Sequence, residues 1–260
     1  MRERVSSPDR VIFPDCGITK GDLADYFGRV QDALLAEIAG RPVSLFRAPK
    51  GLADGGFWQR HPPTGTMGKG FVAVPAGKYT WFRIDDADGL YRAAQIGAVE
   101  IHPWNTTPGT LDRIDRLIVD LDPDEALPFG VVAETAHEVR AWLASRDLDA
   151  RCRATGGKGL HVVAPVDLDW AGLAPLLDAL VTDLMARHPD RFVTTVKKAD
   201  RVGRILLDLA RNHPGSTAVC AWSPRARDHA PIARWVDWGE VDEDLDPAGL
   251  TVRDVLDRRS

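Results

Sequence analysis

Two aspartates stand two positions apart at the end of an apolar run, in the segment Arg-Leu-Ile-Val-Asp-Leu-Asp-Pro at residues 116–123. Side chains alternate between the faces of a strand, so Asp120 and Asp122 share one face while Leu121 packs on the other. Two such carboxylates repel each other unless a cation or a basic group lies between them. Hard divalent ions are held by few carboxylates together with substrate phosphates. The pair is therefore a candidate metal site, although Asp-Pro-Asp-Glu is also good turn chemistry.

A third carboxylate, Asp208, lies inside the apolar run at residues 205–210. An unpaired carboxylate buried there would be costly. Arg201, Arg204 and Arg211 are near in sequence, so a structural salt bridge is one interpretation. A third metal ligand is the other, because two metals bridged by three carboxylates suit in-line phosphoryl transfer. The residues alone leave both interpretations open.

The segment Thr-Gly-Gly-Lys-Gly-Leu-His at residues 155–161 has the composition of an anion-binding loop. Its glycines let backbone N–H groups turn toward an anion, and Lys158 and His161 add charge-assisted donors. It lacks the spacing of a Walker A loop. A tight hairpin turn explains the glycines equally well, but it does not explain Lys158 and His161. His102 is a further candidate phosphate donor, or else a hydrogen-bonded structural histidine.

The elements that must position these residues follow from hydrophobic periodicity. Helices are expected from after Thr19 to residue 38 and over residues 88–96, 131–145 and 170–187. Strands are expected over residues 43–46, 71–74, 79–84, 99–102, 117–121, 151–154, 160–164 and 205–209. A loop rich in Gly and Pro is expected over about residues 48–70, and the C-terminal part is expected to be loop-rich. Strands and helices are mixed without strict alternation, which favours an α+β fold over a doubly wound parallel sheet.

Composition restricts the protein class without naming a function. The 260 residues are 44% hydrophobic and 27% charged, as in ordinary globular proteins. The longest apolar stretches are shorter than the roughly 20 residues of a membrane span, and the N-terminus lacks the apolar segment of a secretory signal. Three widely spaced cysteines suggest neither a disulfide framework nor a zinc site, so a reducing cytoplasm is expected. The net charge of −5 argues against a general nucleic-acid coat but allows a local basic groove.

Taken in order, these segments resemble the primase-polymerase domain of bacterial ligase D, in the archaeo-eukaryotic primase superfamily. The resemblance runs from about Val5 to Val255. Its other landmarks are Ser7-Pro-Asp-Arg-Val-Ile-Phe-Pro, Gly17-Ile-Thr-Lys, Ala39-Gly-Arg-Pro, Val99-Glu-Ile-His, Val202-Gly-Arg-Ile-Leu-Leu-Asp, Arg211-Asn and Ser223-Pro-Arg-Ala-Arg. It implies a primase-polymerase fold in which a mixed or antiparallel β-sheet catalytic core is flanked by helices. We expect a single domain over residues 1–260, with about residues 1–85 contacting the DNA end, its 5′-phosphate and the template, and about residues 86–260 forming the catalytic core.

The resemblance also implies roles for individual residues. Asp120, Asp122 and Asp208 would be catalytic and hold divalent ions, Mn²⁺ or Mg²⁺. The incoming nucleotide would be contacted by His102, Thr155, Gly156, Gly157, Lys158, His161, Arg201 and Arg225. Arg10 and Lys20 would bind the DNA 5′-phosphate, and Phe57 and Trp58 would stack on the template. The chain departs from the family where Thr155 replaces a serine, Arg10 replaces a lysine, and Arg211 replaces a frequent glutamine.

The resemblance implies a DNA-directed nucleotidyltransferase that adds NTPs or dNTPs to a 3′-hydroxyl at gapped or broken DNA ends, in end-joining or gap-filling repair. We expect a cytoplasmic and nucleoid-associated protein without membrane contacts, and a stand-alone form and a part of a larger ligase both remain open, with the stand-alone form slightly favoured. Its partners would be a separate DNA ligase and a Ku-type end-binding protein. Two alternatives remain: a nucleotide-sugar glycosyltransferase that uses the Asp-x-Asp metal site, and a non-catalytic DNA-end-binding module.

Overall fold

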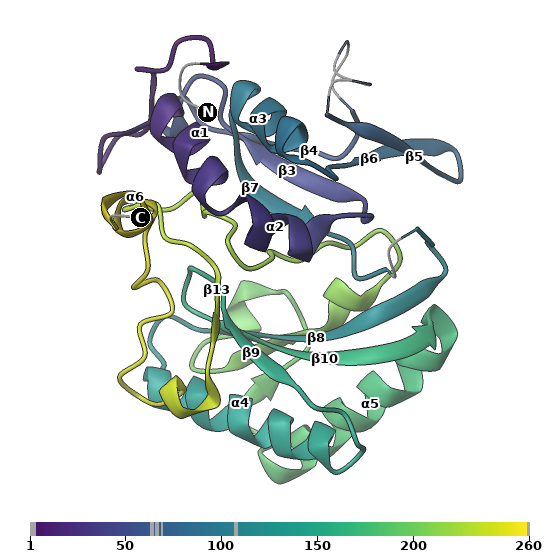
Figure 1. Ribbon diagram of the computed structural model, residues 1–260. Coiled ribbons are helices and arrows are strands. Elements are labelled where there is room, and N and C mark those ends of the chain that lie inside the picture. Colours follow the sequence, from purple (N-terminus) through teal and green to yellow (C-terminus); the bar gives the residue numbers. More distant parts are fainter. Residues whose placement is uncertain (1–3, 63–64, 66–67, 69, 107–108, 259–260) are drawn as a thin grey trace. The chain divides into compact units, whose positions relative to one another are not determined.

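The protein is described by a computed structural model that covers residues 4–62, 65, 68, 70–106 and 109–258 (Figure 1). It has the mixed α+β composition that the sequence predicts, with antiparallel and mixed sheets. The chain packs as two compact units. Unit 1 comprises Met1–Trp104, Thr217–Arg234 and Leu250–Ser260, and unit 2 comprises Asn105–Ser216 and Trp235–Gly249. The expected division of roles near residue 85 concerns function and stays a prediction.

Unit 2 is built on a six-stranded sheet. In sheet order its strands are β11 (Phe192–Val193), β12 (Ile205–Asp208), β8 (Arg113–Pro123), β10 (Leu160–Asp169), β9 (Arg151–Ala154) and β13 (Arg234–Val236). β11 and β12 are parallel, whereas β12 with β8, β8 with β10, and β10 with β9 are antiparallel. The strands of this sheet that carry Asp208, the Asp120/Asp122 pair and His161 are therefore neighbours, because β12, β8 and β10 are consecutive in it.

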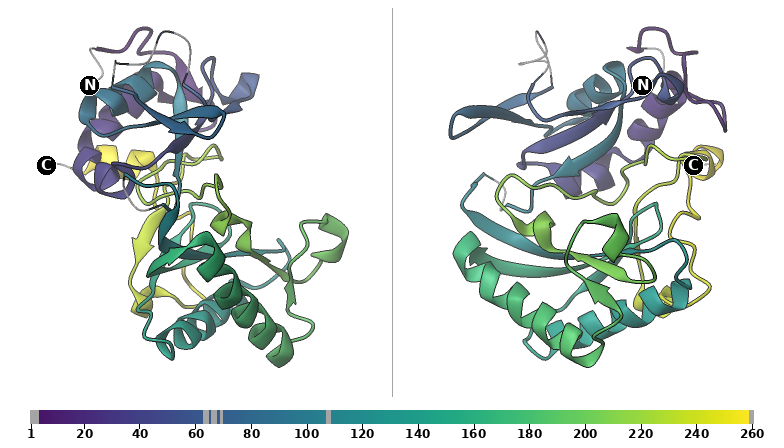
Figure 2. Two further views of the ribbon diagram at one scale, coloured as in Figure 1. Left: turned by 90° about the vertical axis from the view of Figure 1, so that its right-hand side faces the viewer. Right: turned by 180° about the vertical axis from the view of Figure 1, so that it is seen from behind.

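Two long helices, α4 (Phe129–Ala144) and α5 (Trp170–Arg187), pack along one face of this sheet (Figures 1 and 2). The hydrophobic core between these helices and the sheet contains every second residue of the strands, among them Leu121, Cys152, Val162 and Leu207. Because strand side chains alternate, the residues between these positions emerge on the opposite face. That face carries the polar and charged side chains described below.

Unit 1 contains a three-stranded sheet in the order β4 (Phe57–Gln59), β3 (Val43–Arg47), β7 (Ala98–Pro103). Two antiparallel pairs accompany it: β1 (Val11–Phe13) with β2 (Ile18–Thr19), and β5 (Val72–Ala76) with β6 (Tyr79–Arg83). Its helices are α1 (Lys20–Arg29), α2 (Gln31–Ile38), α3 (Ala87–Gln95) and α6 (Val252–Asp257). Arg29 on α1 donates hydrogen bonds to the carbonyls of Val255 and Arg258, which ties the C-terminal helix to the first one.

The expected helix after Thr19 is present but consists of two helices. Thr19 is the N-cap of the first helix, and it forms a capping box with Asp22. The prediction of a single helix that continues to residue 38 was wrong, because Val30 leaves helical geometry, with φ −99° and ψ 8°, and its side chain makes no capping hydrogen bond. Both helices still bury their apolar faces in one core, where Phe27 and Leu34 are fully buried.

Strand β4 lies within the segment expected to be a loop, of which residues 63, 64, 66, 67 and 69 are outside the described structure. Its residues are half exposed, so it lacks the buried alternation that marks a strand in sequence. The C-terminal part, expected to be loop-rich, contributes β13 and α6. Across the described ranges, no helix combines the length and the apolar character that a membrane crossing requires.

Candidate functional site

The three candidate aspartates emerge on one face of the unit 2 sheet. Asp120 and Asp122 are two residues apart on β8, and Asp208 on β12 lies directly opposite Asp120. Their chain neighbours Leu121 and Leu207 are paired with each other and are buried in the core on the helix side. The register therefore places Asp208 beside the Asp-x-Asp pair, on the face away from α4 and α5.

Basic side chains compensate the three carboxylates. The Nε of Arg211 is 3.2 Å from Oδ2 of Asp120, and its Nη2 is 3.1 Å from Oδ2 of Asp208. Arg201 donates a hydrogen bond to Asp122. The salt bridge considered for Asp208 thus exists, with Arg211 as the partner. Among the described residues, no three His, Cys, Asp or Glu side chains converge closely enough to form a ready metal cluster.

Asp120 faces His161 from the neighbouring strand β10, and both are almost fully buried. Burial by itself raises the pKa of Asp120, but His161 and the Arg211 guanidinium lower it by more, so that the pKa is about 2. Burial lowers the pKa of His161 to about 4, against the opposing effect of Asp120. Near neutral pH the pair therefore consists of an ionised carboxylate and a neutral imidazole. His161 is adjacent to Asp120 as a neutral hydrogen-bonding group and not as a cation.

The glycine-lysine loop joins β9 to β10 and packs tightly against the end of β8. A Cβ atom on Gly159 would lie 2.3 Å from the carbonyl oxygen of Leu121, so only glycine permits this approach. Thr155 donates its hydroxyl to the carbonyl of Gly159, and Gly156 donates its N–H to the carbonyl of Pro247. These contacts fix the loop so that Nζ of Lys158 lies 3.8 Å from Oδ1 of Asp122.

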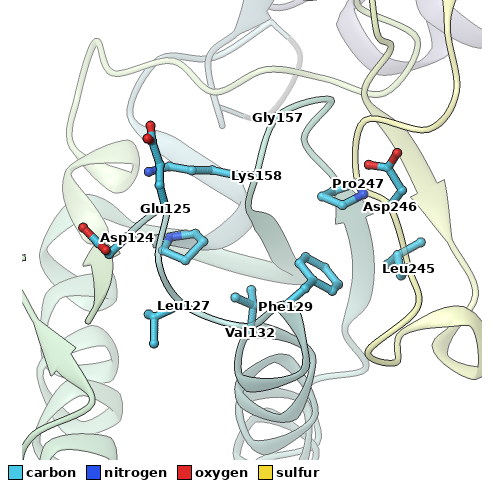
Figure 3. A pocket seen from close by; sticks show the side chains of 11 residues that line it. Asp124, Glu125, Leu127, Phe129, Val132, Gly157, Lys158, Leu245, Asp246 and Pro247 are labelled. Atoms are coloured by element: carbon cyan, nitrogen blue, oxygen red, sulfur yellow. The ribbon is translucent and has the colours of Figure 1, made fainter. Parts of the chain in front are cut away.

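A cavity of about 400 Å³ lies on the α4 side of this loop (Figure 3). Phe129 and Val132 from α4 form part of its apolar wall, and Gly157 and Lys158 come from the loop. Lys158 and Glu125 lie together at one side of it, and Asp246 lies at the other (Figure 3). Lys158 thus belongs both to the carboxylate site and to the rim of this cavity.

Two other candidates, His102 and Arg225, meet on an acidic residue in unit 1. Oε2 of Glu100 is 2.7 Å from Nε2 of His102 and 3.1 Å from Nε of Arg225. Burial raises the pKa of Glu100, but His102 and Arg225 together with the N–H of Ala226 lower it to about 2. The Trp58 ring packs edge-on against His102 at 4.7 Å between ring centroids. Glu100 therefore organises a cluster that contains three of the residues singled out in the sequence.

The remaining candidates lie elsewhere in unit 1. Arg10 donates to the carbonyl of Pro49, and the buried ammonium of Lys20 donates to the carbonyl of Ser6. Burial, followed by the nearby charge of Arg10, lowers the pKa of Lys20. Phe57 is exposed and lies under the guanidinium of Arg47. As adjacent residues of β4, Phe57 and Trp58 point to opposite faces of the strand.

Three charged residues of these clusters were not assigned from the sequence. Arg211 was considered as a salt-bridge partner of Asp208 and as a departure from the family, and its contact with Asp120 depends on strand pairing. Glu100 stands two residues before His102 on β7, so strand alternation could have indicated that they share a face. Arg153 is fully buried and hydrogen-bonded to His161, and no motif in the neighbouring sequence indicates this role.

The family model for the LigD primase-polymerase domain matches residues 19–260. The chain is 34% identical over 245 residues to the multifunctional non-homologous end joining protein LigD of Pseudomonas aeruginosa, covering 92% of this chain and 29% of that protein. It is 31% identical over 264 residues to the Mycolicibacterium smegmatis protein of the same name, covering 99% of this chain and 34% of that protein. The chain therefore spans about a third of the length of these curated relatives.

Among solved structures, the fold is similar to the polymerase domain from Mycobacterium tuberculosis ligase D in complex with DNA. The TM-score is 0.88 with 29% sequence identity, and the match covers 97% of this chain and 92% of that chain. The architecture, the family model and the curated relatives agree on one assignment. This chain belongs to the LigD primase-polymerase domain family, whose members are metal-dependent nucleotidyltransferases that act as DNA polymerases.

Proposed function

We propose that this chain is a DNA-directed nucleotidyltransferase that adds NTPs or dNTPs to a 3′-hydroxyl at gapped or broken DNA ends, in end-joining or gap-filling repair. The observation that carries the proposal is the group of three carboxylates, Asp120, Asp122 and Asp208, on one sheet face with Lys158 beside it. Family membership favours this function over a nucleotide-sugar glycosyltransferase or a non-catalytic end-binding module. Both units together are proposed to form one primase-polymerase domain.

The donor set fits a hard divalent cation, Mn²⁺ or Mg²⁺. Asp120, Asp122 and Asp208 offer carboxylate oxygens, which are the ligands such ions prefer, and the depressed pKa keeps Asp120 ionised. Arg211 and Arg201, which now neutralise these oxygens, must withdraw for the cation to be held. When bound, divalent ions supply activation of the 3′-hydroxyl and neutralisation of the pyrophosphate leaving group.

The chain's own residues bind and orient the substrates. Lys158 has an ammonium that can leave Asp122 for an incoming phosphate, since the two atoms are 3.8 Å apart and the side chain is partly exposed. Thr155 and Gly156 fix the shape of the loop through hydrogen bonds that they donate to the carbonyls of Gly159 and Pro247. The proposed nucleotide contacts are His102, Thr155, Gly156, Gly157, Lys158, Arg201 and Arg225. His161 was expected among them, but both of its ring nitrogens contact Arg153 and Asp120, so we assign it to the carboxylate site instead. Catalysis then rests mainly on positioning and on electrostatic stabilisation of the charge that develops on the phosphates.

The DNA would be recognised by residues of unit 1. We propose that Arg10 and Lys20 bind the 5′-phosphate, for which Lys20 must exchange its bond to Ser6 for one to the phosphate. Trp58 and Phe57 offer half-exposed rings for stacking on the template. A separate DNA ligase and a Ku-type end-binding protein are the proposed partners, and the cytoplasm, at the nucleoid, is the proposed location.

Primer extension tests this function. The protein is incubated with a 5′-phosphorylated gapped duplex, Mn²⁺ or Mg²⁺, and either NTPs or dNTPs. Asp120→Ala and Asp208→Ala should abolish extension while DNA binding persists, and Arg113→Gln, which removes an exposed charge on β8, is the matched control. Extension by either aspartate variant at a near wild-type rate would refute the assignment. Equal activity without the 5′-phosphate would remove the role of Arg10 and Lys20.

A further inference from the structure

A row of directly paired residues crosses four strands of the unit 2 sheet. Arg153 on β9 lies opposite His161 on β10, and His161 lies opposite Asp120 on β8. Asp120 in turn lies opposite Asp208 on β12. Directly opposed residues have their side chains on the same face and within reach of each other. Arg153 therefore stands at the end of the row that leads to the carboxylates, although nothing in the proposed function uses it.

Arg153 is among the most deeply buried side chains of the protein, with 1% of its surface exposed. A buried guanidinium is costly unless it is paired. Its Nη2 is 2.8 Å from Nδ1 of His161, and its central carbon lies 5.1 Å from the ring centroid of Trp235. A guanidinium over an indole is attracted by the electron-rich ring face. These contacts hold the guanidinium against the imidazole and away from solvent.

This contact determines where His161 carries its ring proton. A guanidinium has only donors, so Nδ1 of His161 must accept the hydrogen bond and the proton must reside on Nε2. Nε2 faces Oδ1 of Asp120 at 3.4 Å. The other tautomer would direct an N–H at the guanidinium and a lone pair at the carboxylate, which is unfavourable at both ends. The geometry therefore specifies a relay from Arg153 through His161 to Asp120.

We propose that Arg153 is a positioning residue of the metal site, which fixes His161 as the Nε2–H tautomer so that His161 holds Oδ1 of Asp120 and leaves Oδ2 for the cation. Oδ2 is the oxygen that Arg211 contacts at 3.2 Å, so it is directed toward the other carboxylates. This inference rests on the proposed function, because that function places the cation at Asp120. Groups that orient a metal ligand change metal affinity by roughly 10- to 100-fold when they are removed.

The tautomer is tested by nitrogen NMR of the full chain carrying ¹⁵N-labelled histidine, with the His161 signals assigned by their loss in His161→Gln. We expect a protonated Nε2 and an unprotonated Nδ1 in the wild type. Arg153→Met should produce a mixture of tautomers, whereas Arg153→Lys, which keeps a donor, should restore the wild-type pattern. Arg151→Met is the matched control, because Arg151 is exposed and stacks on the same Trp235 ring.

Calorimetric titration with Mn²⁺ alone tests the consequence for the site. Arg153→Met should weaken Mn²⁺ binding about 10-fold, and Arg153→Lys should bring it back toward the wild-type value. Cys152→Ala, a buried change on the opposite face of β9, controls for a general loss of stability and should leave Mn²⁺ affinity unaltered.

A protonated Nδ1 in wild-type His161 would overturn the proposal without any variant, so a misfolded Arg153→Met protein does not prevent the test. Unchanged tautomer and Mn²⁺ affinity in Arg153→Met would overturn it as well. Neither measurement requires polymerase activity. If the NMR and calorimetric results are as expected but no primer is extended, the proposed function fails while the role of Arg153 stands.

Discussion

Replacing Arg211 with glutamine should make metal binding tighter. Arg211 now neutralises both Asp120 and Asp208, with nitrogen–oxygen distances of 3.2 and 3.1 Å. A divalent cation that takes these oxygens must first displace the guanidinium. Glutamine removes the positive charge, so that the two carboxylates are left without their counter-ion until a cation binds. The substitution should therefore favour the metal-bound state at the expense of the metal-free one.

The size of the effect follows from the exposure of the side chain. An exposed ion pair contributes about 0–1 kcal/mol, and a pair 4 Å apart near a protein surface has a Coulomb energy of about 4 kcal/mol before desolvation. The Arg211 side chain is 42% exposed, whereas the Asp120 and Asp208 side chains are 11% and 14% exposed. We therefore expect about 1–2 kcal/mol for both contacts together, which corresponds to roughly 5- to 30-fold tighter Mn²⁺ binding.

Two measurements on metal-free protein test this expectation. Calorimetric titration gives the Mn²⁺ dissociation constant, and thermal unfolding in EDTA gives the stability of the metal-free state. Arg211→Gln should lower Tm in EDTA by about 2–6 °C, and the difference should disappear or reverse at saturating Mn²⁺. Arg113→Gln, which breaks an exposed pair with Asp167 on the same sheet, should change neither response to metal. Equal or weaker Mn²⁺ binding by Arg211→Gln would refute the reasoning.

Three further predictions concern groups around the site. Gly159→Ala should destabilise the protein by about 2 kcal/mol or more and weaken triphosphate binding, because the new Cβ would lie 2.3 Å from the carbonyl oxygen of Leu121. Denaturant unfolding measures the first effect and nucleotide titration the second. Wild-type stability and affinity in this variant would contradict the packing argument. The pKa of His161 is lowered from 6.5 to about 4, so between these pH values the unfolded state binds a proton that the folded state does not. The free energy of unfolding should therefore fall by up to about 3 kcal/mol as the pH decreases from 6.5 to 4. Unfolding measured as a function of pH should show a smaller fall for His161→Gln. Glu100→Gln should lower the free energy of unfolding by about 2 kcal/mol and weaken nucleotide affinity, because His102 and Arg225 lose the negative charge that holds them together. Unchanged nucleotide affinity in calorimetry would show that this cluster does not contribute to nucleotide binding.

The local pattern of the sequence determined a large part of the fold and of the site. The period of two placed Asp120 and Asp122 on one strand face, and the period of 3.6 located the helix over residues 170–187 with its observed bounds. Both are properties of neighbours in the chain, whose geometry is set by backbone sterics. The order of the motifs then indicated the family.

Tertiary structure alone decided which distant residues meet. The register of β12 against β8 set Asp208 opposite Asp120, and it brought Arg211 onto both carboxylates. In the same way, the pairing of β9 with β10 places the buried guanidinium of Arg153 against His161, a contact that no local sequence pattern predicts. Such pairings depend on which strands become neighbours and in what register, and these are fixed by burial of the opposite faces against α4 and α5. The sequence therefore specified the candidate ligands, and the sheet specified their partners and their charge state.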